Sequence, residues 1–285
     1  LVIRRFKRFE EAVFELPGHI VLAGPNNTGK TTVLQAVAAW DLALTRWKQL
    51  NNFQRRGGSY PWAPLARHDF SAVPLRTFEL LWRGKDYQGT VEVEIQSARG
   101  WSICMEFQSN STEQIYVRPT RHADPALLRE ASVPTVYVPS MTGLIGTQEP
   151  VYQRPKLDQL LGQGRPGDII RNLLVEAHHS ETSWAPLTEG IERLFGYKLL
   201  PPDASQADIL AEYDSSKSLR LDIASAGSGF QQVLLLLTFL HTRPASVLLL
   251  DEPDAHLHVI LQDAIYGELR SVAARQTSQL IIEVE

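Results

Sequence analysis

The chain has 285 residues, of which 44% are hydrophobic and 21% charged, the balance of a globular protein with a sizeable core. Its net charge of −4 excludes an overall basic field for nucleic acid, although an acidic average can hide local basic patches. Cys104 is the only cysteine, which excludes an intrachain disulfide framework and fits a reducing cytoplasm. No apolar run approaches the roughly 20 residues that cross a bilayer, so we expect no membrane segment.

The first half of the chain predicts strands, a glycine-rich loop and a long helix. Residues 1–16 alternate as two short strands, and His19–Ala23 is a short apolar strand that runs into the loop. Helical periodicity follows over Lys30–Trp47. Residues 51–75 are rich in Gly, Pro, Arg and aromatic residues, which indicates an irregular insertion. Period-two alternation then predicts an antiparallel meander from three segments: Phe78–Trp82, Thr90–Ile95 and Trp101–Phe107.

The second half predicts helices, a hairpin and buried strands. The helices are expected over Asp168–His178, Trp184–Phe195, Gly229–Leu240 and Leu257–Ala274. The strands are expected over Thr135–Val138, Ile209–Tyr213, Ser218–Ile223, Ser246–Leu250 and Gln279–Ile282, the second and third of them forming the hairpin. We interpret residues 1–285 as one composite domain. Residues 1–50 and 205–285 would form its core, and residues 51–204 the meander and a helical insert.

The glycine-rich loop matches the phosphate-binding pattern G-x-x-x-x-G-K-[ST] over Gly24–Thr31, after a strand and before a helix. Such a loop turns backbone N–H groups towards phosphate oxygens at a helix N-terminus. Lys30 would reach the β- and γ-phosphates of ATP, and the Thr31 hydroxyl would bind Mg²⁺. Asn27 tolerates left-handed backbone better than most residues. The predicted ATP-binding residues of this stretch are Gly24, Asn26, Asn27, Thr28, Gly29, Lys30, Thr31 and Thr32.

Two carboxylates follow the apolar run Val247–Leu250. Asp251 and Glu252 would stand at the carboxyl end of a buried parallel strand, the edge where α/β proteins place their sites. Acidic residues at a strand end are common by themselves. The phosphate loop upstream favours the interpretation that this pair acts on a bound nucleotide. Asp251 would hold Mg²⁺ with Thr31, and Glu252 would polarise the water that attacks the γ-phosphate.

A second glycine-rich stretch, Ser225–Gln232, lies at the start of the predicted buried helix and upstream of Asp251. We call it the signature stretch. The order GPNNTGKTT, SAGSGFQQ and LLLDEPDAHLH resembles the ABC-like ATPases of the SMC, RecF and OLD (overcoming lysogenization defect) group. The resemblance covers about 45 N-terminal and 65 C-terminal residues. It implies an α/β P-loop NTPase fold with an ABC-type head: a mixed core sheet with helices, an antiparallel β-subdomain and a helical insert.

In that group, the signature stretch of one subunit closes over ATP held by the phosphate loop of another. The resemblance therefore implies an ATP-dependent head dimer in which Ser225, Gly227 and Gly229 contact the partner's nucleotide. The stretch also fits a helix N-cap at Ser225 followed by flexible glycines.

The sequence departs from the group in two respects. The group usually carries a sensor histidine after the last strand, whereas Glu283-Val-Glu285 follows Ile282 here, so the histidine is absent or a segment is missing. No glutamine loop is unmistakable either, and Gln148 and Gln153 remain candidates.

Two further clusters have ordinary interpretations. His256 and His258 lie two apart, a spacing at which helical side chains do not face the same way, and relatives carry a similar pair in the dimer-facing D-loop. Residues 4–8 contain four basic side chains that favour a solvated strand face over a nucleic-acid contact.

The resemblance implies an ATPase acting in DNA repair or anti-phage defence. The alternative is an ATPase subunit that regulates a partner nuclease or effector, and a transporter motor is less favoured. The sequence contains no long heptad run and therefore predicts no coiled coil. It also contains no recognisable set of nuclease residues. The chain starts at Leu1 rather than Met and therefore looks like a fragment, so a further domain could lie beyond residue 285.

Overall fold

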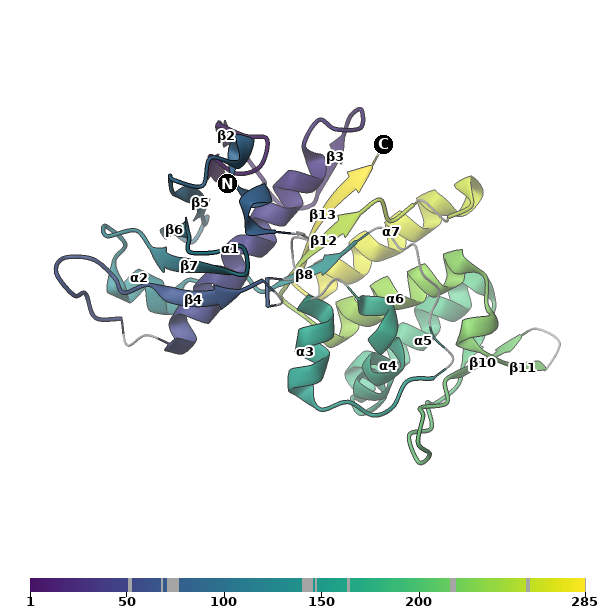
Figure 1. Cartoon of the computed structure of the whole chain (residues 1–285). Helices are drawn as coiled ribbons and strands as arrows, with labels where there is room; N and C mark the ends of the chain where they lie inside the picture. Colours follow the sequence, from purple (N-terminus) through teal and green to yellow (C-terminus); the bar gives the residue numbers. More distant parts are fainter. Residues whose placement is uncertain are drawn as a thin grey trace. The chain divides into compact units, whose positions relative to one another are not determined.

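The computed structural model divides the chain into two compact units, Leu1–Tyr137 and Val138–Glu285. The phosphate loop belongs to the first unit, and the signature stretch and the acidic strand end belong to the second (Figure 1). The residues that the structure describes are 1–50, 53–67, 69–70, 77–139, 146, 148–162, 165–215, 219–254 and 257–284.

An antiparallel sheet of six strands organises the first unit, in the order β2-β1-β5-β6-β7-β4. Its core face carries alternate residues: Ile103, Met105 and Phe107 of β6 are all 0% exposed. The sheet confirms the predicted antiparallel β-subdomain. The strand bounds are β1 (Val2–Arg4), β2 (Glu11–Val13), β4 (Ala63–Ala66), β5 (Val91–Gln96), β6 (Ser102–Ser109) and β7 (Gln114–Pro119).

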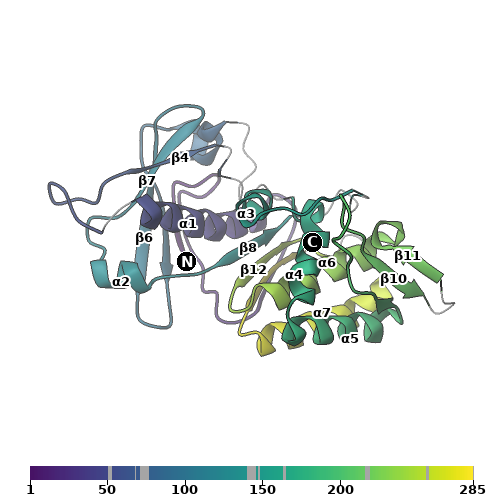
Figure 2. The ribbon, with the colours of Figure 1, turned by 90° about the horizontal axis from the view of Figure 1, so that it is seen from below.

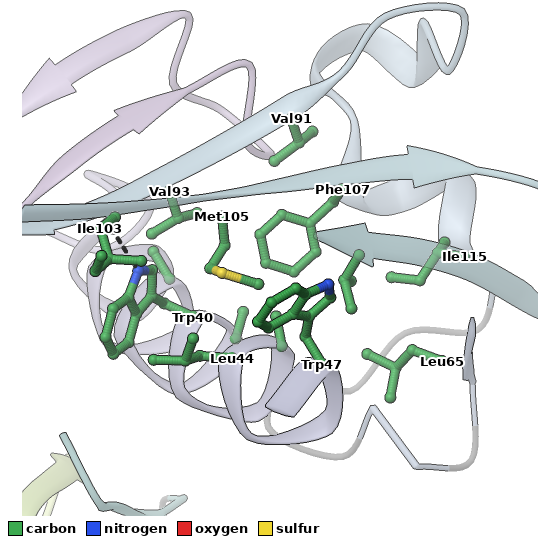
Figure 3. Close-up of a cluster of buried hydrophobic side chains, with 14 of the residues drawn as sticks. Trp40, Leu44, Trp47, Leu65, Val91, Val93, Ile103, Met105, Phe107 and Ile115 are labelled. Atoms are coloured by element: carbon green, nitrogen blue, oxygen red, sulfur yellow. Dashed lines mark hydrogen bonds between the residues drawn. The ribbon is translucent and has the colours of Figure 1, made fainter. Parts of the chain in front are cut away.

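Helix α1 (Lys30–Leu50) packs against strands β4 to β7 and closes this core (Figure 3). Trp40 and Trp47 are fully buried, and each indole N–H finds a backbone acceptor, from Trp40 to the Ile103 carbonyl at 2.8 Å and from Trp47 to the Pro61 carbonyl at 2.9 Å. Buried indoles satisfied in this way fix the rotation of the helix on the sheet. The helix is preceded by β3 (Ile20–Ala23) and the phosphate loop, and α2 (Pro125–Glu130) completes the unit.

The prediction of a strand over Phe78–Trp82 is wrong. Residues Phe78–Leu81 form the 3₁₀ helix η1, followed by a second short 3₁₀ helix, η2 (Arg83–Lys85). Phe78 and Leu81 are both 0% exposed, whereas Leu80 is 39% exposed. Burial at i and i+3 is the pattern of a 3₁₀ turn, in which those side chains eclipse. Residues 51–75, expected to be irregular, contribute the edge strand β4.

Asp41 on α1 gives the first unit a testable pH dependence. Its carboxylate accepts hydrogen bonds from the Thr135 backbone N–H and hydroxyl, both at 2.9 Å. Burial outweighs these bonds and raises the pKa of Asp41 to about 6, from 3.8. Because the folded pKa lies above the unfolded one, the protonated form favours the fold, and this contribution to stability is lost as pH rises through about 6.

We therefore expect Asp41→Asn, which keeps the acceptor oxygen but cannot ionise, to gain stability relative to the parent protein as pH rises. The difference in unfolding free energy should grow by about 2 kcal/mol from pH 4 to pH 8, since one pKa unit corresponds to about 1.4 kcal/mol. Urea unfolding of both proteins at several pH values measures this. A difference that stays constant across pH would contradict it.

In the second unit, four helices pack together with a parallel strand pair. Helix α6 contacts α4, α5 and α7, and α4 and α7 also line α5 (Figure 2). Strands β12 and β13 pair in parallel from Val247↔Gln279 to Asp251↔Glu283. The helices are α3 (Arg154–Gly162), α4 (Ile170–His178), α5 (Glu181–Phe195), α6 (Ser228–Thr242) and α7 (Val259–Arg275). The strands of this half are β8 (Thr135–Val138), which crosses the unit boundary, β9 (Lys198–Leu199), β10 (Glu212–Ser215), β11 (Leu219–Asp222), β12 (Val247–Asp251) and β13 (Gln279–Val284).

The predicted hairpin is present as β10 and β11, joined in register from Glu212↔Asp222 to Ser215↔Leu219, with β9 as a third strand. Helix α6 is buried from Phe230 to His241, as predicted, because helices cover it on several sides. Two 3₁₀ helices, η3 (Pro166–Ile169) and η4 (Ile223–Ser225), precede α4 and α6. In the described part of the chain, no helix combines the length and the hydropathy that a membrane crossing requires.

Candidate nucleotide-binding site

The phosphate loop connects the end of β3 at Ala23 to the start of α1 at Lys30. Gly24, Asn27 and Gly29 have φ values of 153°, 63° and 105°, in the region that L side chains rarely adopt. The expectation that Asn27 tolerates left-handed backbone is therefore confirmed, since a short polar side chain is among the few that enter it. Asn26, Asn27 and Thr28 are exposed, so the loop presents its outer surface to solvent.

Gly29 is required by space as well as by its backbone angle. A Cβ at this position would lie 2.6 Å from Cδ of Arg8 and 2.7 Å from Cζ of Phe9. The Arg8 side chain therefore lies directly against the phosphate loop, although the residue is otherwise exposed. The sequence grouped Arg8 with its basic neighbours, because nothing local reveals that the turn after β1 reaches Gly29.

Those neighbours are held by partners within the first unit. Arg4 pairs with Glu11 at 3.2 Å and Glu92 at 3.1 Å. Arg5 pairs with Asp86 at 2.9 Å. The ammonium of Lys7 donates to Gln35 Oε1 at 2.6 Å. The interpretation of this cluster as a solvated strand face rather than a nucleic-acid contact stays a prediction.

Lys30 folds back over the loop that precedes it. Its side chain is buried, with 8% of its surface exposed, and Nζ donates to the Gly24 carbonyl at 2.6 Å and the Pro25 carbonyl at 3.3 Å. The Thr28 hydroxyl donates to the same Pro25 carbonyl at 2.9 Å. The ammonium is thus placed inside the curve of the loop, where an anion would exchange with the carbonyl oxygens. Thr31 is half-buried and Thr32 is buried on α1.

The acidic strand end lies in the second unit. Leu248, Leu249 and Leu250 of β12 are all 0% exposed, and Asp251 then pairs in register with Glu283 of β13. Glu252 has a φ of 47°, and its backbone N–H donates to the Glu283 carbonyl at 3.1 Å.

Left-handed backbone at a glutamate is uncommon and costs on the order of 1–3 kcal/mol. Glu252 is half-buried at the end of β12, and Ala245 and Thr277 of the same unit share its left-handed backbone. The Mg²⁺ site predicted for Thr31 and Asp251 draws on both units and stays a prediction.

The signature stretch forms η4 and the start of α6. Ser225, Gly227 and Ser228 are exposed, and Gly229 is half-buried. The alternative of an N-cap at Ser225 is wrong: Gly227 is the N-cap of α6 and offers no side-chain hydrogen bond. The Ser225 hydroxyl instead donates to the Asp222 carbonyl at 2.6 Å. The start of α6 is therefore exposed at Gly227 and Ser228 and has no side-chain cap, whereas Phe230 and Gln231 of the same turn are buried.

The buried side chain of Gln231 forms hydrogen bonds to the backbone of this stretch. Its amide nitrogen donates to three carbonyl oxygens at 3.1 Å each, those of Ile223, Ala224 and Ala226. Gln231 is 1% exposed. The sequence prediction named only the serine and glycines, because a bracing glutamine has no signature of its own.

The remaining candidates have local roles or stay predictions. Gln153 lies at the start of α3, where its carbonyl accepts from the N–H groups of Lys156 and Leu157. Gln148 is exposed, and its predicted role remains a prediction. His258 is the N-cap of α7, its Nδ1 accepting from the Ile260 N–H at 3.4 Å. His256 lies outside the described residues.

Residues 147–283 match the model of a protein family described as "AAA domain, putative AbiEii toxin, Type IV TA system". This range contains the signature stretch and the acidic strand end but not the phosphate loop. No curated protein shows a significant match to the sequence.

Among solved structures, the chain is similar to an SMC head bound to the C-winged helix domain of ScpA. The TM-score is 0.59 at 13% identity, with 99% of this chain and 87% of that chain covered. An SMC head domain from Thermotoga maritima has a TM-score of 0.48 at 14% identity, over 99% and 86% of the two chains. An SMC head from Pyrococcus furiosus bound to the C-terminal domain of ScpA has 0.45 at 12%, over 99% and 88%. The first similarity confirms the predicted α/β P-loop fold with an ABC-type head.

Proposed function

We propose that this chain is an ATP-hydrolysing head that pairs with a second copy of itself through two ATP molecules. Each ATP would lie between the phosphate loop of one copy and the signature stretch of the other. The observation that carries the proposal is the start of α6, where Gly227 and Ser228 are exposed and the N-cap makes no side-chain hydrogen bond, which is the chemistry of an anion site at a helix N-terminus.

Within each site, Lys30 would bind the β- and γ-phosphates, and Arg8 would add a second positive charge beside Gly29. The Thr31 hydroxyl and Asp251 would hold Mg²⁺, the cation that accompanies nucleotide phosphates. Glu252 would orient and polarise water for in-line attack on the γ-phosphate. The partner's Ser225, Gly227 and Gly229 would complete the charge stabilisation with backbone N–H groups.

The biological setting that we favour is defence against phage, with DNA repair as the other setting implied by the resemblance. The family description names a putative toxin of a Type IV toxin–antitoxin system, and this supports a defensive role. The same description supports the second candidate, an ATPase subunit that controls a partner effector. The two candidates share the nucleotide chemistry and differ in what the ATP-bound dimer acts on.

Complementation between two inactive variants tests the shared site. Lys30→Ala removes the phosphate-binding ammonium, and Ser225→Arg places a bulky side chain in the exposed part of the signature stretch. In a mixed dimer, both defects fall in one composite site and the other site is intact. Because random mixing of equal amounts gives half mixed dimers, each with one intact site, we expect ATP turnover to recover to about a quarter of the parent value.

The matched control mixes Lys30→Ala with a Lys30→Ala/Ser225→Arg double variant, which leaves no intact phosphate loop in any dimer. This mixture is expected to stay inactive. If the test mixture also stays inactive while each variant remains folded, each head works alone and the sandwich is contradicted.

A further inference from the structure

One arginine of the second unit is buried completely and bonded in several directions. Arg171 on α4 is 0% exposed. Its guanidinium donates to both carboxylate oxygens of Asp222, at 2.9 and 2.6 Å, and to the Ile209 carbonyl at 3.3 Å. Two of its nitrogens also donate to the Gly146 carbonyl, at 3.0 and 3.3 Å. A planar guanidinium with fixed donors holds such a set in one geometry, which a lysine cannot do.

Asp222 connects Arg171 to the signature loop, by which we mean residues 223–227 that precede α6. It is the N-cap of η4, and its Oδ1 accepts from the Ala224 N–H at 2.8 Å while also accepting from Arg171. Its backbone carbonyl accepts from the Ser225 hydroxyl at 2.6 Å. Asp222 is therefore the residue through which the buried guanidinium fixes the loop that presents Ser225 and Gly227.

The other end of the network reaches the segment that follows β8. Buried Glu149 accepts from the backbone N–H groups of Arg171 and Asn172, at 3.0 and 2.8 Å, and from the Asn172 side chain at 2.6 Å. The Asn172 side chain in turn donates to the Pro150 carbonyl at 2.9 Å. Gly146 and Glu149 flank Gln148, which the sequence predicts as a glutamine-loop candidate.

We propose that Arg171 is a positioning residue that joins Gly146 and Glu149 to the signature loop, so that the loop is held ready for the partner's nucleotide. This inference rests on the proposed function, because the loop acts on ATP held by the second copy. A loop of serine, alanine and glycine has many accessible conformations when it is not tied down. Fixing it in advance lowers the cost of closing the dimer and leaves ATP binding at the copy's own phosphate loop unchanged.

The test replaces both charged residues together, because removing only one would leave the other charge buried without its partner and would destabilise the fold. The double variant Arg171→Met/Asp222→Asn removes the ion pair between Arg171 and Asp222. The asparagine side chain can still act as the N-cap of η4. The matched control is Arg243→Met/Glu176→Gln, which removes another partly buried pair of the second unit, bonded at 2.7 Å, whose further hydrogen bonds run to Arg154 and to the Thr242 carbonyl. Both doubles are made in a Glu252→Gln background, in which ATP persists.

Three quantities are measured: thermal unfolding, ATP affinity at concentrations where the protein is monomeric, and the ATP-dependent monomer–dimer equilibrium by analytical ultracentrifugation. We expect the Arg171 double to bind ATP within about threefold of the parent but to dimerise at least tenfold more weakly. The control double should dimerise like the parent even where its unfolding temperature falls as far. Arg171→Lys, which keeps the charge but offers one nitrogen, gives a milder second variant with an intermediate loss.

Parent-like dimerisation of the Arg171 double overturns the inference, and so does an equal defect in the control double. The proposed function is judged separately, on the Glu252→Gln parent alone. If that parent binds ATP and does not dimerise, the sandwich fails before any Arg171 variant is compared.

Discussion

Lys30→Ala is expected to weaken ATP binding at least a hundredfold. The ammonium of Lys30 lies inside the phosphate loop, held by the carbonyls of Gly24 and Pro25, and it would serve two phosphate groups. A hydrogen bond to a charged group contributes about 1.5–3 kcal/mol, so two of them account for a loss of this size. Isothermal titration of the variant with ATP measures the affinity.

The control for this variant is Lys48→Ala, at the other end of the same helix. Lys48 donates to the Ala131 carbonyl at 2.5 Å, so its removal changes a lysine of α1 without touching the phosphate loop. We expect this variant to bind ATP like the parent. Unchanged affinity in a folded Lys30→Ala protein would remove the phosphate loop from the proposed function.

Glu252→Gln should leave ATP binding intact and slow hydrolysis at least tenfold. The amide has the size of the carboxylate and accepts the same left-handed backbone, but it cannot accept a proton from the attacking water. The ATP-bound state should therefore accumulate as a dimer. Single-turnover hydrolysis and sedimentation of the variant with ATP follow both effects.

Asp263→Asn supplies the matched control, since it makes the same chemical change at an exposed carboxylate of α7. Its turnover should equal that of the parent. A Glu252→Gln protein that hydrolyses ATP at the parent rate would show that another group activates the water.

The amino-acid sequence by itself determined the local motifs and the fold class. The phosphate loop, the carboxylates at the end of β12 and the glycine-rich start of α6 were all predicted, because each depends on consecutive residues whose backbone or strand position does the chemistry. The long elements α1 and α6 were also predicted, α1 from its helical periodicity and α6 because its apolar run is longer than most strands.

Short elements needed the tertiary structure. The apolar run Phe78–Leu81 became a 3₁₀ helix, and β4, β7, α2 and α3 were not predicted. Four to nine residues carry too little periodicity to separate one state from another, so packing against neighbours decides. Strand β7 shows this: Ile115 and Val117 alternate as in a strand, but the sheet that buries them is built by residues elsewhere in the chain.

The residues around the motifs were also decided only by the fold. Arg8 lies against Gly29, and Arg171 holds Asp222 from 51 positions away. Asp41 acquires its raised pKa from burial beside Thr135. In each case the property belongs to a pair of residues that are distant in sequence, and their separation in space depends on the packing of whole elements. The sequence therefore determined which groups do the chemistry, and the tertiary structure decided which groups hold them in place.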